Sequence, residues 1–165
     1  MKIEAALPDS AARVAALLRE IGHDRPVLML PSTGKTSAEA AASLGCHVAE
    51  IAKSIVFRRL TDDAAVMVIA SGADRIDEAK VAAIVGPIGK ANAKFVKERI
   101  GYAIGGVCPI GHLSRSVILI DQKLFGFASV WAAAGHPHSV FNLTPAQLQA
   151  MTGAPTVDVS AALPA

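Results

Sequence analysis

The residues best suited to chemistry lie in a glycine-rich loop at 101–112, which holds four glycines and one proline. Glycine admits positive φ and lets another molecule approach the backbone closely, while Pro109 fixes φ and removes one donor. Such a loop can direct several backbone N–H groups into a pocket. The alternative is a turn that only links two buried elements, because glycine-rich turns are common.

This loop does not match either of the familiar nucleotide-binding loops. A P-loop carries a Lys-Ser or Lys-Thr pair after its last glycine, and the dinucleotide fingerprint needs a preceding strand and a helix that opens on its third glycine. Here Gly111 leads into His112 and Leu113 instead. We therefore expect neither kind of phosphate site.

Two further side chains, Cys108 and His136, could act as a nucleophile or a base. Cys108 lies in the glycine-rich loop, where it is either a catalytic thiol or a small apolar side chain beside Pro109. Free cysteine usually behaves as a small apolar residue. His136 has only His138 close to it in the sequence, and no third ligand stands nearby to complete a zinc site. We expect no metal.

Length and composition predict one compact domain. The chain has 165 residues, of which 52% are hydrophobic, and this is enough for one well-buried core and too little for two ordinary domains. No apolar run approaches the roughly 20 residues of a membrane-spanning helix, and no signal peptide is recognisable. The two cysteines lie far apart, so we expect reduced thiols and a cytoplasmic protein.

The charge balance argues against a protein that wraps nucleic acid. Sixteen basic and fourteen acidic residues leave a net charge of +2. Any contact with nucleic acid would have to be local. Lys90, Lys94 and Lys97 could align along one side of a helix, either as a solvated face or as a small anion-binding ridge.

Periodicity and turn residues place these candidates on a series of helices and strands. Helices are expected at 9–21, 36–44, 77–85, from 92 onward and at 144–151, with a helical turn at 129–134 that carries Trp131. Strands are expected at 25–31 on a sheet edge, and at 53–59, 64–70, 116–120, 124–127, 139–143 and 156–159. The hairpin of 53–59 with 64–70 should be central, and 116–120 should pair antiparallel with 124–127.

Four motifs, taken in order, resemble one known family. They are IAKSIVF at 51–57, SGADRID at 71–77, GGVCPIG at 105–111 and AGHP at 134–137. The chain resembles the YbaK/EbsC proteins, stand-alone relatives of the editing domain inserted in bacterial prolyl-tRNA synthetases. The resemblance covers nearly the whole chain, from about Ser10 to Val159.

This resemblance implies a fold, an activity and partners. The fold would be a single α/β domain of the α+β type over residues 1–165, with a mixed, curved, partly barrel-like sheet flanked by helices. The activity would be hydrolysis of the ester between a wrong amino acid and tRNA, often tRNA for proline, without metal or cofactor. The partners would be the acceptor end of mischarged tRNA and, in some cases, a synthetase or an elongation factor, with no membrane.

The resemblance also implies a set of site residues. Lys53 matches the most characteristic functional side chain of the family, at the head of its central strand, and Gly106 belongs to the loop expected to support catalysis. Substrate-binding positions would be Ser54, Gly105, Val107, Cys108, Pro109, Ile110 and Gly111, together with Gly135, His136 and Pro137 on a second loop. Cys108 stands where serine is common, and His136 stands at a variable position.

The chemistry of ester hydrolysis fits such a set. Backbone N–H groups from Gly106 to Ile110 and a cation such as Lys53 would stabilise the negative charge that develops on the carbonyl oxygen. The hydroxyl beside the ester on the terminal ribose could position the water. Lys53 could equally hold a phosphate of the tRNA end. Alanine, serine, threonine and cysteine all remain open as the acyl group, because one methylene gives only about 1–3 kcal/mol of discrimination.

Two other functions remain open at this point. One is a binding module that recognises aminoacylated tRNA or a synthetase without turning anything over. The other is a different hydrolase that uses Cys108 or His136 as nucleophile or base. A membrane or structural role has no support in the sequence.

Overall fold

The computed structural model describes residues 2–3, 7–31 and 36–161. The helices of this part are α1 (Asp9–Glu20), α2 (Ser37–Leu44), α3 (Glu78–Val85), α4 (Ala93–Arg99) and α5 (Pro145–Thr152), with the 3-10 helices η1 (Val48–Glu50) and η2 (Gln122–Gly126). The strands are β1 (Lys2–Ile3), β2 (Leu28–Met29), β3 (Ile51–Arg59), β4 (Ala65–Ser71), β5 (Ile88–Lys90), β6 (Val117–Asp121), β7 (Val130–Ala133), β8 (Ser139–Leu143) and β9 (Thr156–Val157). None of the helices in these ranges combines the length and apolar character needed to cross a membrane.

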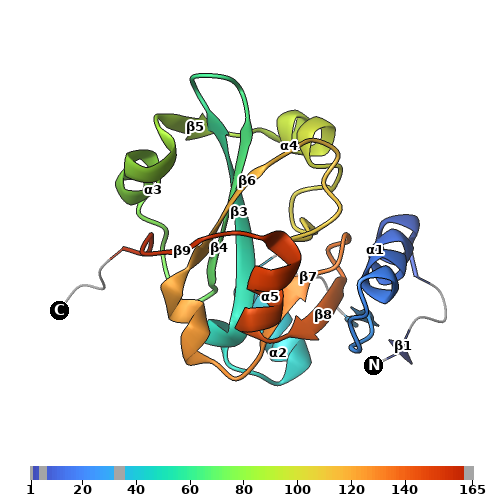
Figure 1. Ribbon diagram of the computed structural model, residues 1–165. Helices are drawn as coiled ribbons and strands as arrows, with labels where there is room; N and C mark the ends of the chain where they lie inside the picture. The colour runs from blue at the N-terminus through green and yellow to red at the C-terminus, as the bar shows by residue number, and fades with distance from the viewer. Residues whose placement is uncertain (1, 4–6, 32–35, 162–165) are drawn as a thin grey trace.

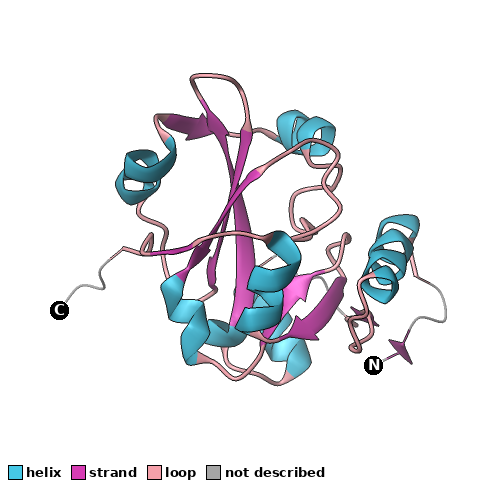
Figure 2. Cartoon of the chain, viewed as in Figure 1, coloured by secondary structure: helices cyan, strands magenta, loops and turns pink. Residues whose placement is uncertain are grey.

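The strands form one mixed sheet, which agrees with the predicted fold class (Figure 1). Their order is β1-β2-β8-β7-β3-β4-β6-β9, and β5 pairs with β3 beside this path. β3 pairs antiparallel with β4 and parallel with β7, while β4 and β9 both run parallel to β6. Figure 2 shows the helices placed around this sheet on several sides.

The hairpin of β3 and β4 lies at the centre of the sheet, as predicted. All residues of β4 are buried, because strands flank it on both edges and other elements cover both faces. Met67 and Ile69 join the largest hydrophobic cluster, whereas Val66 and Val68 join a second cluster on the opposite face. A continuous apolar run is the expected pattern for a strand that is covered in this way.

Four predicted helix starts are confirmed by their caps. Thr36, Asp77, Asn92 and Thr144 each accept a backbone N–H from the first turn of the helix that follows. Such caps satisfy donors that have no partner within the helix, and each contributes about 1 kcal/mol. α1 begins after Pro8 without a side-chain cap.

The prediction of an edge strand at 25–31 was wrong in both its length and its position. Only β2 forms there, and β1 pairs with it on one side while β8 pairs on the other. Pro26 and Pro31 cannot donate to a ladder, so the regular pairing is confined to the residues between them.

The predicted strand at 124–127 is instead the 3-10 helix η2. Asp121 caps it by accepting the N–H of Lys123 at 3.2 Å, and Leu124 is buried at its centre. β6 pairs in parallel with β4 and β9 rather than with an antiparallel neighbour. Parallel partners come from distant parts of the chain, so the local sequence does not reveal them.

The predicted helical turn at 129–134 is the strand β7. Val130 and Ala132 are buried while Trp131 and Ala133 are half-buried, and this alternation is that of a strand. The run of alanines favours a helix in isolation, but the neighbouring strands β3 and β8 determine the outcome. The short strand β5 was not predicted, because Gly86 precedes it closely and Gly89 lies within it.

Candidate functional site

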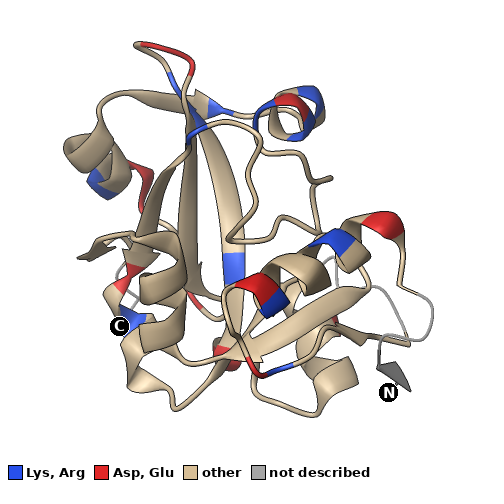
Figure 3. Cartoon of the chain, turned by 45° about the vertical axis from the view of Figure 1, so that its right-hand side comes forward, with Lys and Arg blue, Asp and Glu red and all other residues tan. Residues whose placement is uncertain are grey.

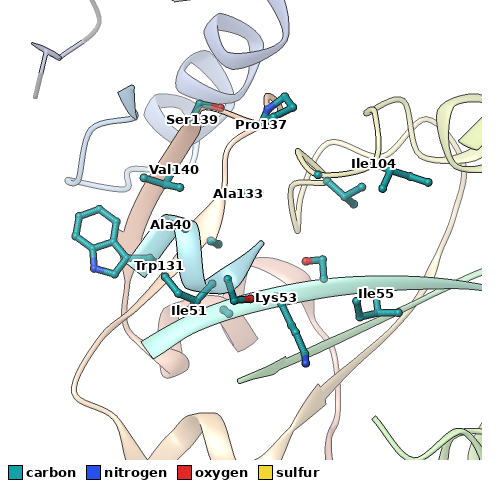
Figure 4. Close-up of a pocket in the computed structure, with 16 residues that line it drawn as sticks. Ala40, Ile51, Lys53, Ile55, Ile104, Trp131, Ala133, Pro137, Ser139 and Val140 are labelled. Atoms are coloured by element: carbon teal, nitrogen blue, oxygen red, sulfur yellow. The ribbon is translucent and has the colours of Figure 1, made fainter. Parts of the chain in front are cut away.

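A cavity of about 290 Å³ lies beside the central strand β3 (Figure 4). It brings together residues from β3, from the glycine-rich loop and from the β7–β8 hairpin. The residues that line it are Ser37, Ala40, Ile51, Ala52, Lys53, Ser54, Ile55, Ile104, Gly105, Val107, Trp131, Ala132, Ala133, Pro137, Ser139 and Val140. Five of the predicted site residues are therefore on its wall.

The cavity exists because β3 lacks a neighbour over part of one edge. β4 pairs with β3 along nearly its full length. On the other edge, β7 pairs only with Ile51 and Ala52, and β5 pairs only from Phe57 to Arg59. Residues 53–56 fall outside the register of both strands, and the loop residues Ile104, Gly105 and Val107 lie over this gap. We call residues 53–56 the β3 gap.

Lys53 borders the cavity, but its ammonium group is directed away from most of the wall. The structure begins β3 at Ile51, two residues earlier than predicted, so Lys53 is not the first residue of the strand. Its Nζ donates to the carbonyl oxygen of Asp74. Figure 4 shows the side chain leaving β3 on the side opposite Ile104 and Pro137.

The surroundings of Lys53 make its ammonium easier to deprotonate. Burial lowers the pKa of Lys53, the nearby Asp74 raises it, and Arg75 lowers it again. The net change is a decrease from the ordinary lysine value. The charge of Lys53 therefore depends on the surrounding groups more than the charge of an exposed lysine does.

Ser54 presents its hydroxyl group to a buried position. Its Oγ is shielded from solvent, and it has no hydrogen-bond partner among the residues that the structure describes. Buried hydroxyl groups nearly always have a partner, and leaving one unpaired costs free energy. Ser54 lines the main cavity and also an adjoining one of about 160 Å³.

Gly106 holds the two loops of the site together. A Cβ atom added at this residue would lie 2.7 Å from the backbone nitrogen of His136, which is closer than side-chain atoms normally approach. The N–H of Gly106 donates to the carbonyl of Ala103 at 3.0 Å, so it is not available in the free protein. Within the described ranges, the N–H groups of Gly105 and Val107 have no partner, and both residues line the cavity.

The remainder of the glycine-rich loop is fixed through its carbonyl groups. His112 bonds to the carbonyl of Cys108 at 2.8 Å, and Tyr102 donates to the carbonyl of Ile110 at 2.8 Å. Arg13 of α1 donates to the carbonyl of Gly111. These contacts hold the loop in one shape, while Cys108, Pro109, Ile110 and Gly111 themselves are not among the residues that line the cavity.

Cys108 belongs to the hydrophobic core. Its side chain is fully buried within the largest cluster, and burial raises the pKa of the Cys108 thiol to about 12. A thiol with such a pKa is almost entirely protonated at neutral pH, and the thiol is a poor nucleophile. The structure therefore favours Cys108 as a small apolar residue of the core over Cys108 as a catalytic thiol.

The second loop reaches the cavity through Pro137. Gly135 has φ of +94°, and an added Cβ would lie 2.7 Å from the carbonyl oxygen of Ser10, so glycine is needed there. His136 accepts the N–H of His138 through Nδ1 at 3.0 Å. Burial lowers the pKa of His136, and the nearby His138 lowers it further, so the surroundings favour the neutral imidazole.

Several residues of the wall were not predicted from the sequence. Ser37 and Ala40 come from α2, Trp131 from β7, and Ile104 from the glycine-rich loop. Trp131 is the only tryptophan of the chain, which is one signal that could have drawn attention to it. The other three have ordinary side chains, and only the packing of distant elements places them at the site.

The structure also tests the predicted row of lysines on one helix. Lys90 belongs to β5 and not to α4, so the three lysines do not form one helical row. Lys94 pairs with Glu98 at 3.8 Å on the exposed side of α4. Among the described residues, no group of three or more His, Cys, Asp or Glu side chains could hold a metal ion.

A family comparison identifies the type of domain. The family described as the aminoacyl-tRNA editing domain matches residues 31–151, which include the β3 gap and both loops of the site. The chain belongs to the aminoacyl-tRNA editing domain family. This finding confirms the resemblance to the YbaK-like editing proteins that the sequence motifs indicated.

The chain is also similar to individual proteins and to a solved structure. The chain is 31% identical over 127 residues to YwhH, an uncharacterised protein of Bacillus subtilis (strain 168), covering 76% of this chain and 80% of YwhH. It is 31% identical over 118 residues to proline–tRNA ligase of Limosilactobacillus fermentum, covering 68% of this chain but 21% of the ligase. A crystal structure described as a candidate trans-editing enzyme for prolyl-tRNA synthetase is 38% identical, with a TM-score of 0.89 over 95% of this chain and 100% of that one.

Proposed function

We propose that this editing domain is a trans-editing hydrolase, which removes a small, wrongly attached amino acid from tRNA for proline or a similar tRNA. The observation that carries the proposal is the cavity beside the β3 gap. Its wall gathers Lys53, Ser54, Gly105, Val107 and Pro137, which come from three sequence motifs that are far apart in the chain. The family membership and the similarity to a prolyl-tRNA synthetase support the same substrate class.

The proposed reaction is attack of water on the ester carbonyl, which places negative charge on the carbonyl oxygen. The N–H groups of Gly105 and Val107 are suited to stabilise this charge, because they face no competing acceptor among the described residues. Val107 is one of the predicted donors, and Gly105 takes the place of Gly106, whose N–H is already bonded to Ala103. Lys53 would leave the carbonyl of Asp74 to contribute its charge to the oxyanion or to a phosphate.

The water would be positioned by the substrate rather than by a protein base. No Cys, His, Asp or Glu is among the residues that line the cavity. We infer that the hydroxyl beside the ester on the terminal ribose orients the water. Cys108 is buried and His136 already accepts a hydrogen bond, so the rival mechanism with either side chain loses support.

The wall of the cavity favours a small acyl group. Apart from Lys53 and three serines, its residues are apolar, and Trp131, Pro137 and Val140 close one side of it. Such a wall excludes large side chains by contact, but it separates alanine, serine, threonine and cysteine only weakly. All four remain candidate acyl groups.

The proposed partner is the acceptor end of tRNA. Figure 3 shows basic and acidic residues interspersed on the face that it displays, in keeping with the net charge of +2. Few phosphate contacts give weak affinity, so help from a synthetase or an elongation factor is part of the proposal. The reaction takes place where aminoacyl-tRNA is used, and we keep the expectation of a cytoplasmic protein.

The test is deacylation of tRNAs charged with alanine, serine, threonine or cysteine, by wild type and by Lys53→Ala. We expect wild type to release at least one of these amino acids, and Lys53→Ala to lose most of that activity. A matched substrate without the neighbouring ribose hydroxyl should be hydrolysed much more slowly. Retained binding of charged tRNA with no hydrolysis of any panel member would favour the non-catalytic binding module.

A further inference from the structure

The β3 gap has the hydrogen-bonding pattern of a sheet edge that is one strand short. Residues of an antiparallel ladder alternate between those that bond to one neighbour and those that bond to the other. The N–H of Gly72 donates to the carbonyl of Ile51 at 2.7 Å, and the N–H of Arg59 donates to the carbonyl of Ala64 at 2.9 Å. The odd-numbered residues of β3 therefore bond to β4.

The even-numbered residues direct their N–H and C=O groups to the opposite edge. There, Ala52 is within the register of β7 and Arg58 is within the register of β5. Ser54 and Val56 lie between them, and both are paired with neither strand. The N–H and the C=O of Ser54 therefore face the β3 gap.

The side chain of Ser54 adds a third polar group at the same point. Its Oγ is buried without a partner in the described part of the chain, at the junction of the main cavity and the adjoining one of about 160 Å³. Gly105 and Val107 line both cavities. An unpaired hydroxyl between two unpaired backbone groups, within a cavity, is best explained by a ligand that supplies the missing partners.

We propose that Ser54 binds the aminoacyl group as if it were one residue of a neighbouring strand. The α-amino group of the substrate donates to the carbonyl and Oγ of Ser54, and the acyl carbonyl oxygen accepts the N–H of Ser54. An aminoacyl group carries one donor and one acceptor in the same order as a residue in a strand, so it can occupy this edge. Ser54 is then a positioning residue that selects acyl groups with a free α-amino group.

This inference rests on the proposed substrate class, but its test does not depend on turnover. The probes are two stable amides, 3′-(alanylamino)adenosine and 3′-(propionylamino)adenosine, which differ only by the α-amino group. Binding is followed through the fluorescence of Trp131, which is the only tryptophan and lines the cavity. We expect the propionyl compound to bind about 10- to 100-fold more weakly, because it lacks the donor.

The variant Ser54→Ala tests the residue itself. Its affinity for the alanyl compound should fall about tenfold, while its affinity for the weaker propionyl compound should change much less, since interacting groups are not additive. Its melting temperature should equal or exceed that of wild type, because the change removes an unsatisfied buried hydroxyl.

Ser139→Ala is the matched comparison for stability. Ser139 lines the same cavity, but its hydroxyl donates to the carbonyl of His136 at 3.1 Å and accepts the N–H of His136 at 3.1 Å. The same substitution should therefore lower the melting temperature there. Equal affinity of wild type for the two amides, binding of neither, or a loss of stability in Ser54→Ala like that in Ser139→Ala would each overturn the inference. Failure of the proposed function would appear separately, as absence of hydrolysis of the charged tRNAs.

Discussion

Lys53 lines the cavity, while its ammonium group has a partner outside it, the carbonyl of Asp74. In the free protein it donates to Asp74, and burial keeps its pKa below the ordinary value for lysine. A substrate oxyanion or phosphate offers a full negative charge in place of a carbonyl dipole, and such charge-assisted bonds are the stronger ones. The proposed function thus requires that the Lys53 side chain leave the carbonyl of Asp74 when the substrate binds.

This arrangement predicts the pH dependence of deacylation. Only the charged form of Lys53 assists the reaction, so kcat/KM should fall as the pH rises through the pKa of Lys53. Because that pKa is lowered, the fall should occur at a lower pH than an ordinary lysine would give. Lys53→Arg retains a positive charge through the same range, so its activity, although reduced, should show no such fall.

The measurement is kcat/KM across the neutral and alkaline range, corrected for uncatalysed hydrolysis of the ester. An alkaline fall of the same shape in wild type and in Lys53→Arg would assign the titration to another group and contradict this role of Lys53.

At the scale of elements, the site depends on the close approach of two loops. The glycine-rich loop and the β7–β8 loop meet where Gly106 contacts the backbone of His136, and no side chain fits between them. We predict that Gly106→Ala lowers the free energy of unfolding by about 1–3 kcal/mol, as overpacking of a core does. It should also reduce deacylation strongly, because Gly105 and Val107 move with the loop.

Gly126→Ala is the matched control for this substitution. An added Cβ at Gly126 meets no atom within 4 Å, and Gly126 is not among the glycines with positive φ. Its stability should stay within about 0.5 kcal/mol of wild type, with unchanged activity. Chemical denaturation and deacylation assays of both variants give the comparison, and a Gly106→Ala protein as stable and active as wild type would show that the loops can separate without cost.

The elements also show which parts of the fold the local sequence determines. Helix starts such as those at Asp77 and Thr144 depend on neighbouring residues, so they were predicted correctly. The sequence at 129–134 predicts a helical turn, because its alanines favour a helix until β3 and β8 pair with β7. The parallel pairing of β6 depends on strands that are distant in the sequence, and no local pattern reveals it.

The same distinction applies to the candidate site. The family motifs predict Lys53 and the glycine-rich loop as site residues, and the structure places Lys53, Gly105 and Val107 on the cavity wall. The unpaired hydroxyl of Ser54 and the contribution of Trp131 follow from packing between distant segments. The hydrogen bond from the N–H of Gly106 to the carbonyl of Ala103 is likewise formed only in the folded loop.

At the scale of the whole molecule, the proposed function requires a choice between two amino acids attached to one tRNA. Sixteen basic and fourteen acidic residues give little attraction for tRNA at long range, so binding alone provides weak selection between tRNAs. The cavity beside the β3 gap then has to distinguish the acyl groups. Editing therefore means that the wrong amino acid is hydrolysed while the correct one is left in place.

The most direct measurement is the rate of deacylation of one proline-accepting tRNA, charged in parallel with alanine and with proline. The account predicts that wild-type protein releases alanine well above the uncatalysed rate. It also predicts that proline stays attached. The secondary amine in the proline ring has one N–H fewer than the amino group of alanine, so it cannot donate to both the carbonyl and the Oγ of Ser54 as proposed. Equal release of the two amino acids, or release of neither together with inactivity towards serine, threonine and cysteine, would contradict the proposal that this domain edits mischarged tRNA.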